Sequence, residues 1–181
     1  MLTTLIIFII IVYIVVKALQ KTEAIGNWSH LFPDMQHDPN SFYLLVDKIL
    51  HEKQVPDFHA RKITIGEGGL LSHNRLYLEI SRGDYIFHIC AAPWGTGFFF
   101  SWWVRQKMSD IDQLLILIPF AGSRIVKMRQ YQSYYKLDTD SMFRNSVHQS
   151  VLAAVDSLTN AKGMRGLSEL ERTPDVRSTI K

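Results

Sequence analysis

The chain opens with an uninterrupted apolar run. Residues 2–16 (LTTLIIFIIIVYIVV) contain no charge, and Lys17 is the first charged side chain. Apolar residues occupy all sides of the helix that such a run would form, which is typical of a helix surrounded by lipid. The run is at the short end for a bilayer core of about 30 Å, but Ala18 and Leu19 lengthen it because a lysine can extend its ammonium group to the interface. We therefore expect residues 1–21 to form a transmembrane anchor.

Two alternatives to an anchor are a cleaved signal peptide and a buried core helix. A cleaved signal peptide needs a basic residue before the apolar run and a small-residue cleavage site, and neither is present around Leu2 or Ala18. A buried core helix would normally carry a polar stripe. Lys17 and Lys21 follow the run, so the positive-inside tendency places the rest of the chain in the cytoplasm. The sequence predicts a single-pass protein of the cell membrane with a cytoplasmic C-terminal domain.

Beyond the anchor, the pattern divides the chain into a linker, a domain and a tail. Residues 22–40 contain Gly26, Pro33 and Pro39 without a persistent period, so we expect a linker there. A helical repeat over residues 41–53 follows, capped by Asn40 or Ser41. The domain is expected over residues 41–173 and a polar tail over residues 174–181.

The middle of the domain alternates between apolar and polar residues in the manner of strands. Alternation is seen in residues 62–66, 75–81, 85–91 and 98–105, and the turn at Gly83-Asp84 predicts a hairpin. Residues 114–120 form a second aliphatic run, and residues 131–137 are a further candidate strand. A long helix is predicted from Thr139 or Asp140 to Lys162, ending at Gly163. The expected fold class is α+β, with a small antiparallel meander packed against two amphipathic helices.

Residues 89–104 are the most unusual stretch, because they hold a dense aromatic group without any charge. This group consists of Trp94, Phe98, Phe99, Phe100, Trp102 and Trp103. One interpretation is a pair of strands buried on both faces. In the other, the aromatic side chains contact the membrane surface or a groove in a partner protein, because Trp favours such interfaces.

His88 and Cys90 are the candidate catalytic residues. They lie two positions apart on a predicted strand, so their side chains point to the same face. A thiol beside an imidazole can act as a nucleophile, although a single cysteine between Ile89 and Ala91 is more often a small buried apolar residue. One cysteine cannot complete a structural zinc site, and no spacing of metal ligands is recognisable. We therefore expect neither a metal nor a cofactor.

The charge of the chain narrows the choice of partner. The net charge is +3, and the basic residues are scattered, so nucleic acid is not an expected partner. The sequence instead favours a non-enzymatic interaction or accessory domain, held at the bilayer and contacting a partner protein or the membrane surface through its aromatic segment. The alternative is a membrane-associated enzyme that acts on a lipid or other apolar substrate with Cys90 and His88.

Overall fold

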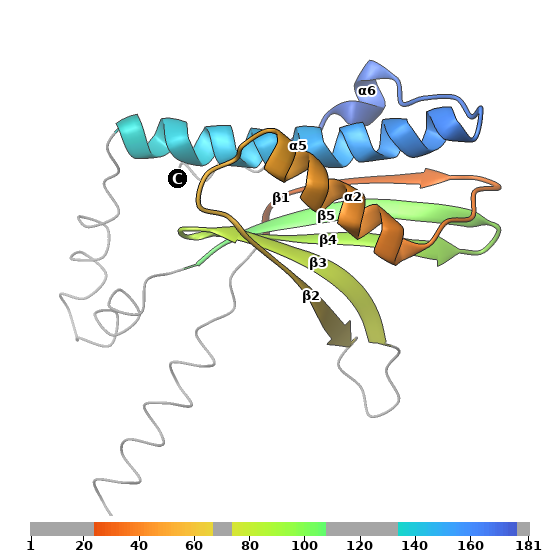
Figure 1. The fold of residues 1–181 in the computed structure, drawn as a ribbon, viewed down its shortest axis with the longest axis horizontal. Helices are drawn as coiled ribbons and strands as arrows, with labels where there is room; N and C mark the ends of the chain where they lie inside the picture. Colours follow the sequence, from red (N-terminus) through yellow and green to blue (C-terminus); the bar gives the residue numbers. More distant parts are fainter. Residues whose placement is uncertain (1–23, 67–73, 108–133, 177–181) are drawn as a thin grey trace, which may run out of the picture.

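A computed structural model describes residues 24–66, 74–107 and 134–176. The predicted anchor, the aliphatic run at residues 114–120 and the tail beyond residue 176 lie outside these ranges. Within them, the elements follow one another as β1 (Ala24–Phe32), α2 (Pro39–Glu52), β2 (His59–Gly66), β3 (Asn74–Arg82), β4 (Tyr85–Trp94), β5 (Gly97–Gln106), α5 (Tyr134–Ala161), α6 (Glu169–Arg172) and β6 (Asp175–Val176) (Figure 1). The fold is α+β.

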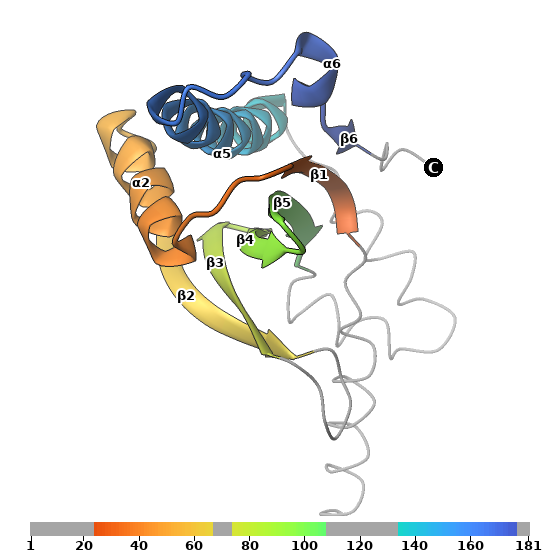
Figure 2. The ribbon, with the colours of Figure 1, turned by 90° about the vertical axis from the view of Figure 1, so that its right-hand side faces the viewer.

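The strands form one antiparallel sheet in the order β2-β3-β4-β5-β1-β6. Strands β2 to β5 are the four strands of the predicted meander. Both α2 and α5 lie on one face of this sheet, and Figure 2 shows that β2 and β3 curve away from β1. The prediction of two helices packed on a meander is confirmed in this coarse form.

Helix α2 begins slightly earlier than the sequence predicted. Its cap is Asp38, whose carboxylate accepts hydrogen bonds from the backbone amides of Asn40 at 3.2 Å and Ser41 at 2.9 Å. Pro39 occupies the first turn, where its missing N–H costs no hydrogen bond. The predicted caps, Asn40 and Ser41, are therefore the residues that Asp38 caps.

Residues 24–32 are not part of a linker, as the sequence suggested, but form strand β1. This strand lies inside the sheet, between β5 and β6. Its inward positions are Gly26, Trp28, His30 and Phe32, which pair with the inward positions of β5. Glycine and histidine weaken the apolar alternation of the strand, and this is why the pattern was missed.

The predicted strand at residues 131–137 is also wrong for its described part. Helix α5 already begins at Tyr134, and both Tyr134 and Tyr135 are exposed. Adjacent exposed side chains are incompatible with a half-buried strand, in which one of the two would face the sheet interior. Lys136, one residue on, forms an ion pair with Asp84 at 2.7 Å, which connects the first turn of α5 to the β3–β4 turn.

The core lies between the helices and the inward face of the sheet. Phe98, Phe100 and Trp102 of β5 are buried there. The ring of Phe42 on α2 packs against Phe100 with centroids 4.7 Å apart, and Phe87 packs against Trp102 at 5.2 Å. Burying each large apolar side chain is worth about 1.5–3 kcal/mol, so these three side chains of β5 contribute several kcal/mol to the packing of the sheet.

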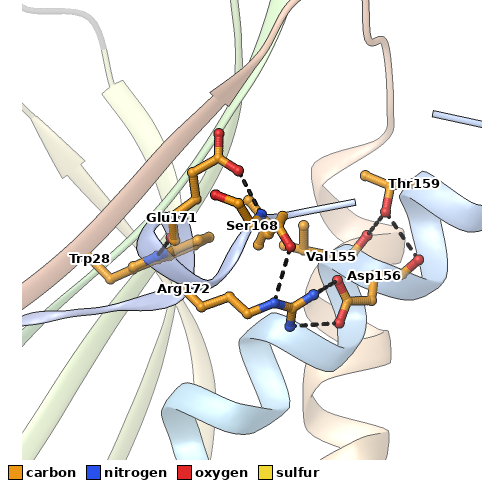
Figure 3. Close-up of polar contacts among 8 residues, drawn as sticks. Trp28, Val155, Asp156, Thr159, Ser168, Glu171 and Arg172 are labelled. Atoms are coloured by element: carbon orange, nitrogen blue, oxygen red, sulfur yellow. Dashed lines mark hydrogen bonds and ion pairs between the residues drawn. The ribbon is translucent and has the colours of Figure 1, made fainter. Parts of the chain in front are cut away.

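The residues after α5 return along the domain as a C-terminal strap, which we define as residues 164–176. The strap is joined to α5 by a bidentate ion pair, in which the Arg172 guanidinium donates to both carboxylate oxygens of Asp156 at 2.8 and 3.0 Å (Figure 3). The indole N–H of Trp28 also donates to the Glu171 carbonyl at 2.6 Å. At its end, β6 pairs with β1 and covers the edge of that strand.

A buried histidine connects the strap to the core of the sheet. The indole N–H of Trp102 donates to His148 Nδ1 at 3.1 Å, so the ring hydrogen resides on Nε2, which donates to the Arg172 carbonyl at 2.9 Å. Burial lowers the pKa of His148, and this favours the neutral form that the two hydrogen bonds require. The strap is thus held by groups that are fully paired.

Candidate functional site

The face of the sheet that points away from α2 and α5 carries the predicted site residues His88, Cys90 and Trp103. Within the described ranges no helix packs on this side, which we call the open face (Figure 2). The antiparallel register brings Arg61, Glu79, His88 and Trp103 into one row across four strands. A second row joins Tyr77, Cys90 and Ser101.

Three residues of the first row, Arg61, Glu79 and His88, form a network of polar contacts. Arg61 Nε donates to Glu79 Oε1 at 2.6 Å, and His88 Nε2 lies 3.3 Å from Glu79 Oε2. Burial on its own raises the pKa of the Glu79 carboxyl, but Arg61 and His88 together bring it below its usual range. Burial is the largest influence on His88 and, with Arg105 and Arg61, holds its pKa below the usual value although Glu79 opposes this. Glu79 therefore bonds to Arg61 through one carboxylate oxygen and to His88 through the other, and His88 Nε2 is engaged by this contact.

Cys90 shares the open face with His88, as their spacing predicted, but its thiol is buried. Burial raises the pKa of this thiol, and the opposing effects of Arg75, Tyr77 and Ser101 are smaller. A nucleophilic cysteine requires an accessible thiolate with a lowered pKa. The geometry supplies no such activation for Cys90.

The aromatic segment divides between the two faces. The side chains of Phe98, Phe100 and Trp102 belong to the core and are inaccessible in the folded domain. Phe99 is half-buried on the open face, Trp103 is 45% exposed there, and Trp94 is 65% exposed at the β4–β5 turn. Only these last three of the predicted contact residues lie at the surface.

An apolar patch forms at the end of the sheet that contains the β4–β5 turn. Leu31 of β1 is 44% exposed and stands opposite Phe99 of β5, which in turn stands opposite Ala92 of β4. Trp94 is the next residue of β4 on the same face. We call Leu31, Ala92, Trp94 and Phe99 the distal patch, because they lie far along the strands from Ala24.

A cavity opens beside the distal patch where β3 and β4 separate. Their pairing ends at Tyr77 and Cys90, while β4 continues to Trp94. The Tyr43 hydroxyl fills the fork, donating to the Leu76 carbonyl at 2.8 Å and accepting from the Ala91 amide at 3.0 Å. Burial raises the pKa of Tyr43, so this hydroxyl stays protonated.

The cavity has a volume of about 380 Å³. Its lining consists of Pro39, Asn40, Ile65, Gly66, Asn74, Arg75, Leu76, Tyr77, Ala91, Ala92 and Pro93. Arg75 is the single charged residue among them. A space of this size with mostly apolar walls and one cation fits an apolar group that carries or adjoins a carboxylate.

Sequence reasoning missed three residues of this site. Leu31 was assigned to the linker, and Tyr43 lies beside the apolar stripe used to predict α2. Arg75 begins a predicted strand and was considered only in a polar group with Glu67 and His73, not as the cation of a cavity. The one available signal was the alternation of β1, in which Leu31 falls opposite to Trp28 and Phe32. The fork itself depends on where two strands part, which no local pattern encodes.

Two further findings hold for residues 24–66, 74–107 and 134–176. No set of three or more His, Cys, Asp or Glu side chains in these ranges is positioned to hold a metal ion. In the same ranges, no helix is both long and apolar enough to cross a membrane.

The fold and the site define a small α+β domain with helices on one face of its sheet and an apolar patch at one end of the other. Comparison with protein-family models, with curated proteins and with solved structures gives no match for this chain.

Proposed function

We propose that this protein is a membrane-anchored, non-enzymatic interaction domain that binds a partner protein on the cytoplasmic side through its distal patch. The observation that carries the proposal is the exposure of Leu31 and Trp94 around Phe99, next to a cavity whose described lining contains one cation, Arg75. Exposed apolar side chains that gather beside a concave, largely apolar site are typical of binding surfaces.

The position of the distal patch favours a protein over the bilayer as its partner. The predicted anchor ends at Lys21, and β1 begins at Ala24. From Ala24 to Phe32 the strand extends roughly 26 Å at about 3.3 Å per residue. The patch therefore lies at the opposite end of the sheet from the anchor, where it faces the cytoplasm.

The chemistry of the cavity indicates what part of a partner would bind. An apolar side chain would enter between Ile65 and Ala92, and a carboxylate beside it would pair with Arg75. Trp94, which lies at the adjacent β4–β5 turn, would cover the bound segment of the partner. An extended partner segment with an aliphatic or aromatic residue next to an acidic one meets these requirements.

The alternative, an enzyme that uses Cys90 and His88, receives no support from this geometry. The thiol is buried and its pKa is raised, while the imidazole is engaged by Glu79. The interaction domain is the better account of the surface.

The anchor is tested first, by fractionating cells that express the full chain. We expect the protein to remain in the membrane pellet after extraction at alkaline pH and to dissolve only in detergent. Recovery in the soluble fraction would refute the anchored part of the proposal, whatever the patch binds.

The patch is tested by site-specific photocrosslinking in intact membranes. A photoreactive amino acid at Trp94 or at Leu31 should give one shared protein adduct, because both side chains belong to the same patch. The same amino acid at Lys48, an exposed residue of α2, is the matched control and should not give that adduct. Changing Arg75 to Gln should weaken the adduct several-fold while the circular dichroism spectrum is unchanged. Adducts with lipid alone, or equal adducts from all three positions, would refute the proposal.

A further inference from the structure

The end of the domain opposite the distal patch is assembled from four separate segments. Ala24 at the start of β1 stands opposite Arg105 near the end of β5. The Lys107 amide donates to the Asp84 carbonyl at 2.6 Å, and the Asp84 carboxylate pairs with Lys136 in the first turn of α5. We call this the near end; in Figure 1 it is the end at which α5 begins.

Aromatic and basic side chains face solvent at the near end. Tyr134 and Tyr135 are 84% and 81% exposed, which is unusual for two adjacent large side chains. Arg105 and Lys107 are also exposed. Tyrosine is enriched at the headgroup level of membranes, and cations there are attracted to the anionic lipids of the cytoplasmic leaflet.

The carboxylates of the near end do not cancel this character. Asp84 is occupied by Lys136, and Asp140 is buried, where burial raises the pKa of its carboxyl. Arg144, from the next turn of α5, lies over the Tyr85 ring at 5.5 Å and adds another cation. Asp138 is the exposed acidic residue on this first turn of α5. Among the residues that the structure describes, the near end is therefore mainly basic and aromatic.

Chain connectivity brings this surface to the bilayer. Two residues lie between Lys21 and Ala24, so the chain takes three steps of at most about 3.6 Å each, or about 11 Å in total. If the anchor ends at the interface, the start of β1 cannot be farther from it than this. The other segments of the near end are joined to the start of β1 by the contacts described above.

We infer that the near end rests directly on an anionic membrane surface, with Tyr134 and Tyr135 at the level of the headgroups and Arg105 and Lys107 against lipid phosphates. This inference relies on the anchor in the proposed function, but not on the partner of the distal patch. Such a contact holds the strands upright on the bilayer. A bare tether would leave the domain free to rotate.

The inference is tested with the full chain in nanodiscs. In a Cys90→Ala background, a fluorophore is attached either to Tyr135→Cys at the near end or to Thr96→Cys at the β4–β5 turn. Discs contain phosphatidylcholine alone or an equimolar mixture with phosphatidylglycerol, together with a lipid that carries a quencher at its headgroup.

We expect the label at position 135 to be quenched at least twofold more in mixed discs than in phosphatidylcholine discs, and the label at position 96 to be unaffected. Raising the ionic strength should reduce the difference, because the contact is partly electrostatic. Lys107→Glu should reduce it as well. Lys162→Glu makes the same charge change at the far end of α5, about 40 Å away, and should leave the quenching unchanged.

Each outcome separates this inference from the proposed function. A chain that does not enter nanodiscs removes the anchor and with it both claims. A chain that enters the discs but shows equal quenching at positions 135 and 96, or equal quenching in the two lipid compositions, overturns the contact of the near end while the anchor stands. Equal effects of the two charge reversals would overturn it too.

Discussion

Replacing His148 with phenylalanine tests how the C-terminal strap is held to the sheet. The imidazole accepts from Trp102 Nε1 at 3.1 Å and donates to the Arg172 carbonyl at 2.9 Å, and it is only 7% exposed. Phenylalanine keeps the ring but leaves both partners unpaired. A buried polar group without a partner costs about 1–3 kcal/mol. The Arg172 carbonyl can recover some hydration near the surface, so we expect His148→Phe to lose about 2–4 kcal/mol of unfolding free energy.

The prediction is sharpened by a double-mutant cycle with Trp102→Phe. That single change leaves His148 Nδ1 without its donor, whereas the double variant removes both ends of the bond. Replacing both partners by apolar groups costs less than the two single changes together. We expect a coupling free energy of about 1–2 kcal/mol. His148→Gln, which keeps one acceptor and one donor, should cost less than His148→Phe.

The assay is urea unfolding of the full chain in detergent, followed by circular dichroism of the helices. Circular dichroism is preferred to fluorescence because one of the variants removes a tryptophan. Unfolding midpoints are compared only between variants with the same m-value, so that a change in the unfolded state is not mistaken for a change in stability. A loss below about 0.5 kcal/mol for His148→Phe, or additive effects in the cycle, would refute the reasoning.

Two further predictions concern the same scaffold. The pKa of His148 in the folded chain lies below the ordinary value of 6.5, so the unfolded chain binds the proton more readily. The stability that His148 contributes should therefore be complete above about pH 6.5 and lost as the pH falls below it. In thermal melts across this range, the melting temperature should fall less for His148→Gln than for the native chain, and parallel falls would contradict the assignment. Gly97→Ala should destabilise the domain by about 1–3 kcal/mol, because the added Cβ would lie 2.6 Å from the backbone oxygen of Phe32; the denaturation midpoint measures this, with Gly166→Ala as a control position that has open space.

The sequence predicted the strands whose buried and exposed sides differ in polarity. Strands β3 and β4 alternate because one face packs on the helices. The prediction for β3 was one residue short at each end, and the prediction for β4 began at the right residue but ended three residues early. Strand β1 was lost because Gly26 and His30 occupy two of its four inward positions. The cap of α2 was misplaced by two or three residues because Asp38, Asn40 and Ser41 are all good capping residues, and only the backbone conformation distinguishes them.

The aromatic segment shows where local reasoning reaches its limit. The period of two already implied that Phe98, Phe100 and Trp102 share one face and that Phe99 and Trp103 share the other. Both faces are rich in aromatic residues, however, so the pattern could not say which face the helices cover. The cavity was beyond prediction for a different reason, because it exists only where β3 departs from β4 and Tyr43 arrives from α2 to complete their hydrogen bonds.

The place of β1 inside the sheet has a mechanical consequence. Its first residue adjoins the predicted anchor, and it runs antiparallel to β5, whose own beginning adjoins the β4–β5 turn. Tension between the proposed anchor and a partner bound beside that turn would act along the strands and at right angles to the hydrogen bonds that join them. All of those bonds would bear the load together rather than opening one by one from an end.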